Sequence, residues 1–87
     1  MLKEGKAMDV ELEVSLYPLT EEFLEHPVED FVKLLEQHGC TVEHTALSSM
    51  VKGESERVFE AVRLGYEQAV QKSGCVLIVK ACNACPL

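Results

Sequence analysis

Two hydrophobic periodicities alternate along this chain, and the order in which they occur is the feature that most limits its fold. Residues 10–17 alternate apolar and polar side chains, which is the period of a strand with one buried face. Two later segments carry apolar residues at helical spacing, and they run from Pro27 to Gly39 and from Gly53 to Gly74. Three more segments are rich in β-branched or apolar residues and are predicted to be strands, 41–46, 48–52 and 75–82.

The predicted order, β-α-β-β-α-β, is that of a split pair of β-α-β units. Right-handed crossovers place the first and third strands at the centre of a four-stranded antiparallel sheet, with both helices on one face. We therefore expect an α+β, ferredoxin-like βαββαβ sandwich formed by residues 9–87 as a single domain, preceded by an N-terminal tail of residues 1–8. The apolar helix faces predict three aromatic core residues, Phe31, Phe59 and Tyr66.

The second face of this sheet is predicted to be open, because both helices cover the first. The last strand would contribute Val76 and Ile78 to the open face. Since an exposed apolar patch of this kind marks an interaction surface, the sequence predicts a homodimer or homotetramer that assembles through the open sheet face.

The charge balance and the distribution of apolar residues exclude several classes of partner. The chain has a net charge of -7, which repels nucleic acid rather than binding its phosphates. No apolar run approaches the roughly 20 residues that span a bilayer, and the first residues lack the apolar segment of a signal peptide. We expect a cytoplasmic protein that binds neither nucleic acid nor a membrane.

Cys82 and Cys85 have the C-x-x-C spacing of zinc sites and of dithiol redox sites. A structural zinc site needs four ligands, and Cys40, Cys75 and His44 would have to complete it from separate strands. A redox pair draws its reactivity from a helix N-terminus, whereas this pair follows a strand. We expect free thiols and no resident metal or cofactor, with metal or redox use as an alternative.

No catalytic group can be assigned from the spacing of the residues, and we expect no enzymatic activity. None of the three histidines is placed with a nucleophile and an orienting carboxylate, and there is no glycine-rich phosphate loop. Glu11, Glu13 and Lys80 are of more interest, because the first and last strands are predicted neighbours and Lys80 would oppose one of the two carboxylates. A salt bridge at an oligomer interface explains this arrangement at least as well as a ligand site does.

Three segments stand out, Val-Ser-Leu-Tyr-Pro-Leu at 14–19, Leu-Ser-Ser-Met-Val-Lys-Gly-Glu at 47–54 and Asn-Ala-Cys-Pro at 83–86. Together they resemble the YkoF-related thiamine- and hydroxymethylpyrimidine-binding family. The resemblance implies a ferredoxin-like unit, present in tandem or as associating single units, that binds or carries the pyrimidine part of thiamine. With one unit, this chain would form a homodimer or homotetramer to rebuild the tandem arrangement. Cys82 departs from the family pattern, since it creates the C-x-x-C spacing.

A 4-aminopyrimidine needs polar partners for its amino group and ring nitrogens, and an apolar wall for its flat face. The residues predicted to supply them are Tyr17, Thr45, Ser48, Ser49, Met50, Asn83, Glu11 and Glu13. A carboxylate would also attract the cationic thiazolium ring of thiamine. The predicted function is non-enzymatic binding of thiamine or its hydroxymethylpyrimidine moiety, as a carrier in thiamine salvage or transport.

Two alternatives come from other function classes. The first is a homo-oligomeric regulatory or assembly module, in which the open sheet mediates pairing and no aminopyrimidine binds saturably. The second is a metal or redox protein that uses Cys82 and Cys85, which would retain stoichiometric zinc or iron on purification.

Overall fold

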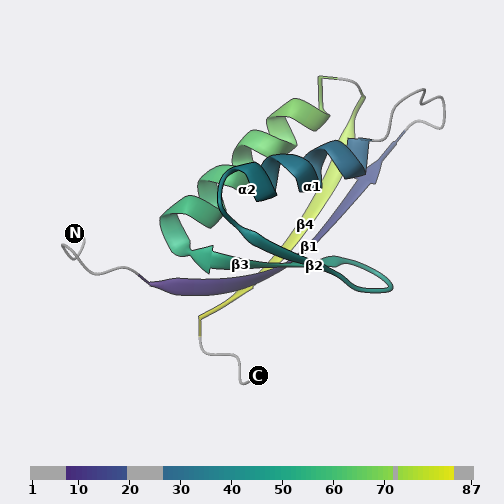
Figure 1. Ribbon diagram of the computed structural model, residues 1–87. Helices are drawn as coiled ribbons and strands as arrows, with labels where there is room; N and C mark the ends of the chain where they lie inside the picture. Colours follow the sequence, from purple (N-terminus) through teal and green to yellow (C-terminus); the bar gives the residue numbers. More distant parts are fainter. Residues whose placement is uncertain (1–7, 20–26, 72, 84–87) are drawn as a thin grey trace.

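The computed structural model describes residues 8–19, 27–71 and 73–83 (Figure 1). Its elements follow the predicted order, with the bounds β1 (Asp9–Pro18), α1 (Pro27–Gln37), β2 (Thr41–His44), β3 (Ser49–Glu54), α2 (Ser55–Ala69) and β4 (Cys75–Cys82). The strands form one four-stranded antiparallel sheet in the order β2-β3-β1-β4, and both helices cover the same face of it. This arrangement confirms the expected α+β, ferredoxin-like fold, with β1 and β3 at the centre.

The bounds of several elements differ from the sequence prediction. β2 stops at His44 rather than at residue 46, because Thr45 begins a tight turn that its own hydroxyl closes. β3 extends to Glu54, because this residue still pairs with Asp9, the first residue of β1. The helix α2 stops at Ala69. No helix among the described residues is long and apolar enough to cross a membrane.

β1 lies between β3 and β4, and its register decides which side chains share a face. Leu12 is opposite Val51 on β3, whereas Glu13 is opposite Met50 on β3 and Lys80 on β4. Because successive residues of a strand point to opposite faces, Leu12 faces the helices and Glu13 faces the open side. The polar side of the predicted alternation therefore lies on the open face of the sheet.

The hydrophobic core lies between the helices and the covered face of the sheet. β1 contributes alternate residues, of which Leu12 is completely buried. The other members of the core cluster are Val10, Val14, Phe31, Val32, Leu35, Cys40, Val51, Val58, Ala61 and Val62. Full burial of a large apolar side chain contributes about 1.5–3 kcal/mol, so this layer holds both helices on the sheet.

Small residues bring the two helices close together. The buried stripe of α2 consists of Val58, Ala61, Val62, Gly65 and Ala69. Phe59 follows Val58 directly, so it turns about 100° away from this stripe and is 45% exposed, and its prediction as a core residue is wrong. Phe31 is buried as predicted, and Tyr66 is half-buried, with its hydroxyl donating a hydrogen bond to the Cys75 carbonyl at 3.1 Å.

A Gly65→Ala substitution is expected to destabilise the fold, although alanine is the better helix former. A Cβ atom at position 65 would lie 2.7 Å from Cδ1 and 2.9 Å from Cε1 of Phe31. Overpacking costs about 1–3 kcal/mol against a gain of about 1 kcal/mol in helix propensity, so chemical denaturation should show a net loss of up to about 2 kcal/mol. Gly74→Ala is the control, since its Cβ would meet Leu19 at an ordinary 3.5 Å. A Gly65→Ala protein more stable than the parent would contradict this close helix packing.

The open face divides into an apolar end and a charged end. Val76 and Ile78 lie on it, as predicted, and they are 42% and 49% exposed. Tyr17, opposite Val76, belongs to the same apolar end. The charged end carries two ion-paired couples, Glu11 with Lys52 and Glu13 with Lys80.

Candidate ligand-binding site

The loop between β2 and β3 is a tight turn that holds Ser48 in place. The Thr45 Oγ1 atom accepts hydrogen bonds from the backbone N–H of Leu47, at 3.3 Å, and of Ser48, at 2.9 Å. The Thr45 N–H donates to the Ser48 carbonyl at 2.8 Å. Threonine suits such a turn because its hydroxyl bonds to nearby backbone groups. The turn leaves Leu47 at its tip, 88% exposed.

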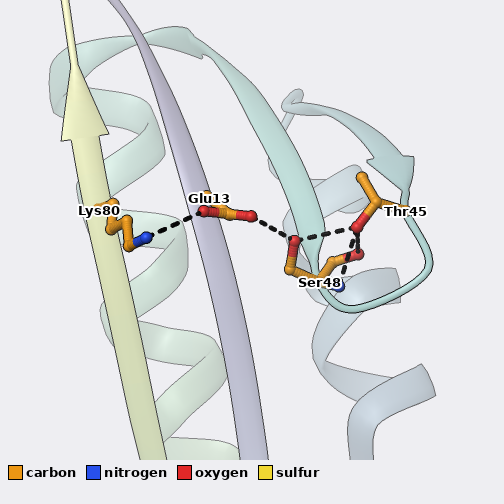
Figure 2. Close-up of polar contacts among 4 residues, drawn as sticks. All are labelled: Glu13, Thr45, Ser48 and Lys80. Carbon is orange, nitrogen blue, oxygen red and sulfur yellow. Dashed lines mark hydrogen bonds and ion pairs between the residues drawn. The ribbon is translucent and has the colours of Figure 1, made fainter.

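Glu13 connects this turn to β4 (Figure 2). The Ser48 hydroxyl donates to Glu13 Oε2 at 2.9 Å, and Lys80 Nζ lies 3.8 Å from Glu13 Oε1. Thr45 Oγ1 lies 3.0 Å from the Ser48 hydroxyl and extends the network. Lys80 is opposite Glu13 in the register of β1 and β4, which confirms the predicted pairing of this lysine with a carboxylate of the first strand. Because the Lys80 side chain is 79% exposed, this ion pair is easily exchanged for another partner.

An open hollow of about 250 Å³ lies beside this network on the open face. Its lining residues are Glu13, Ser15, Tyr17, Leu47, Ser48, Ile78 and Lys80. Tyr17 and Ile78 are each 49% exposed, so they present apolar surface next to a carboxylate and a hydroxyl. Small-molecule sites combine an apolar wall with a few polar groups and usually measure about 300–1,000 Å³. The hollow lies just below that range, which suits a single ring better than a larger ligand.

Several of the residues predicted for the site gather at this hollow. Glu13, Tyr17 and Ser48 line it, and Thr45 is bonded to Ser48. Met50 is opposite Glu13 and therefore shares the open face, although it does not line the hollow. The structure thus brings a carboxylate, two hydroxyls and an aromatic ring together from β1 and the turn between β2 and β3.

Three residues predicted for the site lie elsewhere. Ser49 pairs with Val14, so the register places it on the helix-covered face of the sheet. Glu11 and Asn83 line a second hollow, of about 370 Å³, at the other end of β1. There Glu11 Oε2 lies 3.9 Å from Lys52 Nζ. One ring-sized ligand in the first hollow would not reach these residues.

Three lining residues were missed at the sequence level. Ser15 could have been found, because it stands between Glu13 and Tyr17 on the polar side of the alternation in β1. Ile78 is opposite Ser15 on β4, so the same register argument that paired Lys80 with Glu13 would have included it. Leu47 carried no such signal, since its place at the turn tip depends on the hydrogen bonds of that turn.

The cysteines differ in environment. Cys40 and Cys75 are free and buried, and burial raises the pKa of the Cys40 thiol, an effect that the positive charge of Arg57 partly offsets. Cys82 is disulfide-bonded, so the expectation of a free thiol is wrong at this position. It stands at the end of an edge strand, where the core does not shield it, and Cys85 lies outside the described residues. In the part of the chain that the structure describes, no cluster of three or more His, Cys, Asp or Glu residues could hold a metal ion.

The order of the strands and the placement of both helices on one face define a ferredoxin-like α+β protein. Within this class the chain belongs to the YkoF-related family, which matches residues 9–86. The match confirms the family resemblance carried by the segments around Tyr17, Ser48 and Asn83. No curated protein matches the chain.

Solved structures of low sequence identity share this fold. A hypothetical protein from Methanocaldococcus jannascii has a TM-score of 0.79 at 18% identity, over 87% of this chain and 80% of that one. A domain of unknown function from Bacillus cereus has a TM-score of 0.74 at 17% identity, over 86% and 75% of the two chains. A Thermotoga maritima protein provisionally assigned to thiamine biosynthesis or salvage has a TM-score of 0.73 at 19% identity, over 84% and 81%. At these identities the likeness establishes the fold alone.

Proposed function

We propose that this chain binds thiamine or its hydroxymethylpyrimidine moiety in the hollow beside Glu13, without covalent chemistry, and carries it in thiamine salvage or transport. Membership of the YkoF-related family and the structural likeness to the Thermotoga maritima protein support this class of ligand. The observation that carries the proposal is the hydrogen-bonded pair of Glu13 and Ser48 next to the exposed ring of Tyr17.

The polar groups of the hollow complement a 4-aminopyrimidine. The Glu13 carboxylate can accept a hydrogen bond from the exocyclic amino group, in exchange for its exposed ion pair with Lys80. The Ser48 hydroxyl can donate to a ring nitrogen, because a hydroxyl serves as either donor or acceptor. Tyr17 and Ile78 then cover the flat face of the ring.

Electrostatics favour the unphosphorylated forms of the ligand. The thiazolium ring of thiamine is cationic, and both the Glu13 carboxylate and the net charge of -7 attract it. A diphosphate group is repelled by the same charges. Thiamine and free hydroxymethylpyrimidine are therefore expected to bind more tightly than thiamine diphosphate.

Thiamine and hydroxymethylpyrimidine are each expected to raise the melting temperature of the full chain, and thiamine diphosphate to raise it less. A ligand at about 100 times its Kd adds about 2.7 kcal/mol of stability, which shifts the melting temperature of a domain of this size by roughly 10–20 °C. Ser48→Ala should reduce the shift, whereas Ser73→Ala, outside the hollow, should preserve it. The proposal fails if neither unphosphorylated ligand stabilises the parent protein.

A second candidate function, homo-oligomeric assembly through the open sheet face, is favoured by the apolar end of that face. Tyr17, Val76 and Ile78 are exposed there, and Leu47 stands beside them at the turn tip. A protein that forms a homodimer or homotetramer but gains no stability from any aminopyrimidine would be an assembly module. If zinc or a chelator alone shifts the melting temperature of the reduced protein, in which Cys82 is a free thiol, the metal or redox function of Cys82 and Cys85 takes precedence.

A further inference from the structure

Three polar side chains stand in one row across the open face of the sheet (Figure 2). Lys80 on β4 is opposite Glu13 on β1, and its Nζ atom lies 3.8 Å from Glu13 Oε1. On the other side of Glu13, the Ser48 hydroxyl donates to Oε2 at 2.9 Å. Each outer group thus contacts its own oxygen of the Glu13 carboxylate. All three residues line the first hollow, so a ligand there meets them as a set.

Thr45 fixes the direction of the Ser48 hydroxyl. A hydroxyl group donates one hydrogen bond and accepts two. Thr45 Oγ1 already accepts from the backbone N–H groups of Leu47 and Ser48. It therefore has no lone pair left for the Ser48 proton, although the two hydroxyl oxygens lie only 3.0 Å apart. Ser48 donates toward Glu13 and the hollow, and not back into the turn.

The row accordingly offers a donor, an acceptor and a second donor, in the order Ser48, Glu13 and Lys80. An ammonium group only donates and a carboxylate only accepts. The complementary ligand edge is an acceptor, a donor and an acceptor. Hydroxymethylpyrimidine has this edge, because its amino group stands between a ring nitrogen and the carbon that carries the hydroxymethyl group. With the ring nitrogen at Ser48 and the amino group at Glu13, the hydroxymethyl oxygen faces Lys80.

We infer that Lys80 makes the hollow selective for the free alcohol, hydroxymethylpyrimidine, over thiamine. The inference rests on the proposed function and names which of its two ligands the site prefers. When the amino group takes the place of Lys80 on the Glu13 carboxylate, the Lys80 ammonium is released to donate to the hydroxymethyl oxygen. In thiamine that oxygen is absent, and the same methylene carbon carries the cationic thiazolium ring. Lys80 then loses an acceptor and faces a positive charge.

The repulsion between Lys80 and the thiazolium ring sets the expected size of the preference. Two like unit charges about 4 Å apart in water change a Kd by about fivefold. The value for water applies because the Lys80 side chain is 79% exposed. Glu13 attracts the thiazolium ring, but its carboxylate is shared with the amino group and lies on the next strand. Hydroxymethylpyrimidine is therefore expected to bind about fivefold more tightly than thiamine.

Isothermal titration calorimetry on the full chain tests this preference with three ligands. They are hydroxymethylpyrimidine, its methyl analogue without the hydroxyl oxygen, and thiamine. The parent protein should bind hydroxymethylpyrimidine most tightly, the neutral methyl analogue less tightly and thiamine least tightly. Lys80→Met should bind thiamine as tightly as hydroxymethylpyrimidine, and it should no longer distinguish the methyl analogue. Lys80→Arg should keep the parent order, because it retains both the charge and the donors.

Lys52→Met is the matched control. Lys52 pairs with Glu11 at 3.9 Å and lies outside the first hollow, so the substitution removes the same charge without changing the row. Its ratio of Kd values should equal that of the parent. The inference is overturned if the parent binds thiamine as tightly as hydroxymethylpyrimidine, or if Lys80→Met keeps the parent preference. A parent protein that binds neither ligand would instead overturn the proposed function, and this inference with it.

Discussion

Replacement of Leu12 with alanine is expected to lower the free energy of unfolding by about 2–5 kcal/mol. Leu12 is completely buried on the central strand β1, opposite Val51, which is also completely buried. The cavity left by the substitution lies between the sheet and both helices, where neighbouring elements have little freedom to collapse into it. Thermal denaturation should show a melting temperature lower by roughly 8 °C or more.

Leu47→Ala is the matched control for this experiment. It makes the same chemical change at the tip of the turn between β2 and β3, where the side chain is 88% exposed. Its effect on the free energy of unfolding should stay within about 0.5 kcal/mol. Equal stability of the Leu12→Ala and Leu47→Ala proteins would show that the core is not centred on β1.

The order and layering of the elements could be predicted because their signals are local. The alternation in residues 10–17 identifies a half-buried strand, and the crossover rule then places the first and third strands at the centre. The position of Phe59 could not be predicted in the same way. Val58 and Phe59 are both apolar, and which of them faces the sheet depends on the close approach of α1 at Gly65.

Part of the candidate site followed from the same alternation, and the rest depended on register. Glu11 and Glu13 lie on the same side of β1, so the sequence could predict a partner for Lys80 without choosing between them. The observed pairing selects Glu13. The roles of the two adjacent serines depend on where β3 begins. Ser48 precedes the strand, stays in the turn and donates its hydroxyl hydrogen bond to Glu13. Ser49 is the first residue of the strand and lies on the helix-covered face of the sheet.

Removal of the Glu13 charge is expected to weaken ligand binding most strongly among single substitutions in the hollow. Glu13→Gln retains the length of the side chain and a carbonyl acceptor but loses the carboxylate that Ser48 and Lys80 contact. Hydrogen bonds to charged groups contribute about 1.5–3 kcal/mol, so the Kd for hydroxymethylpyrimidine should rise about tenfold or more in isothermal titration calorimetry. The loss should be larger for thiamine, because its thiazolium ring also loses an attractive charge.

Glu67→Gln separates this local effect from the change in net charge. Glu67 pairs with Arg63 on the exposed surface of α2, away from the hollow, so the substitution removes the same charge without touching the site. Its Kd for both ligands should equal that of the parent. If Glu13→Gln and Glu67→Gln bind both ligands alike, the carboxylate at Glu13 is not the acceptor of the aminopyrimidine. Glu11, which lines the second hollow beside Lys52, would then be the carboxylate to replace next.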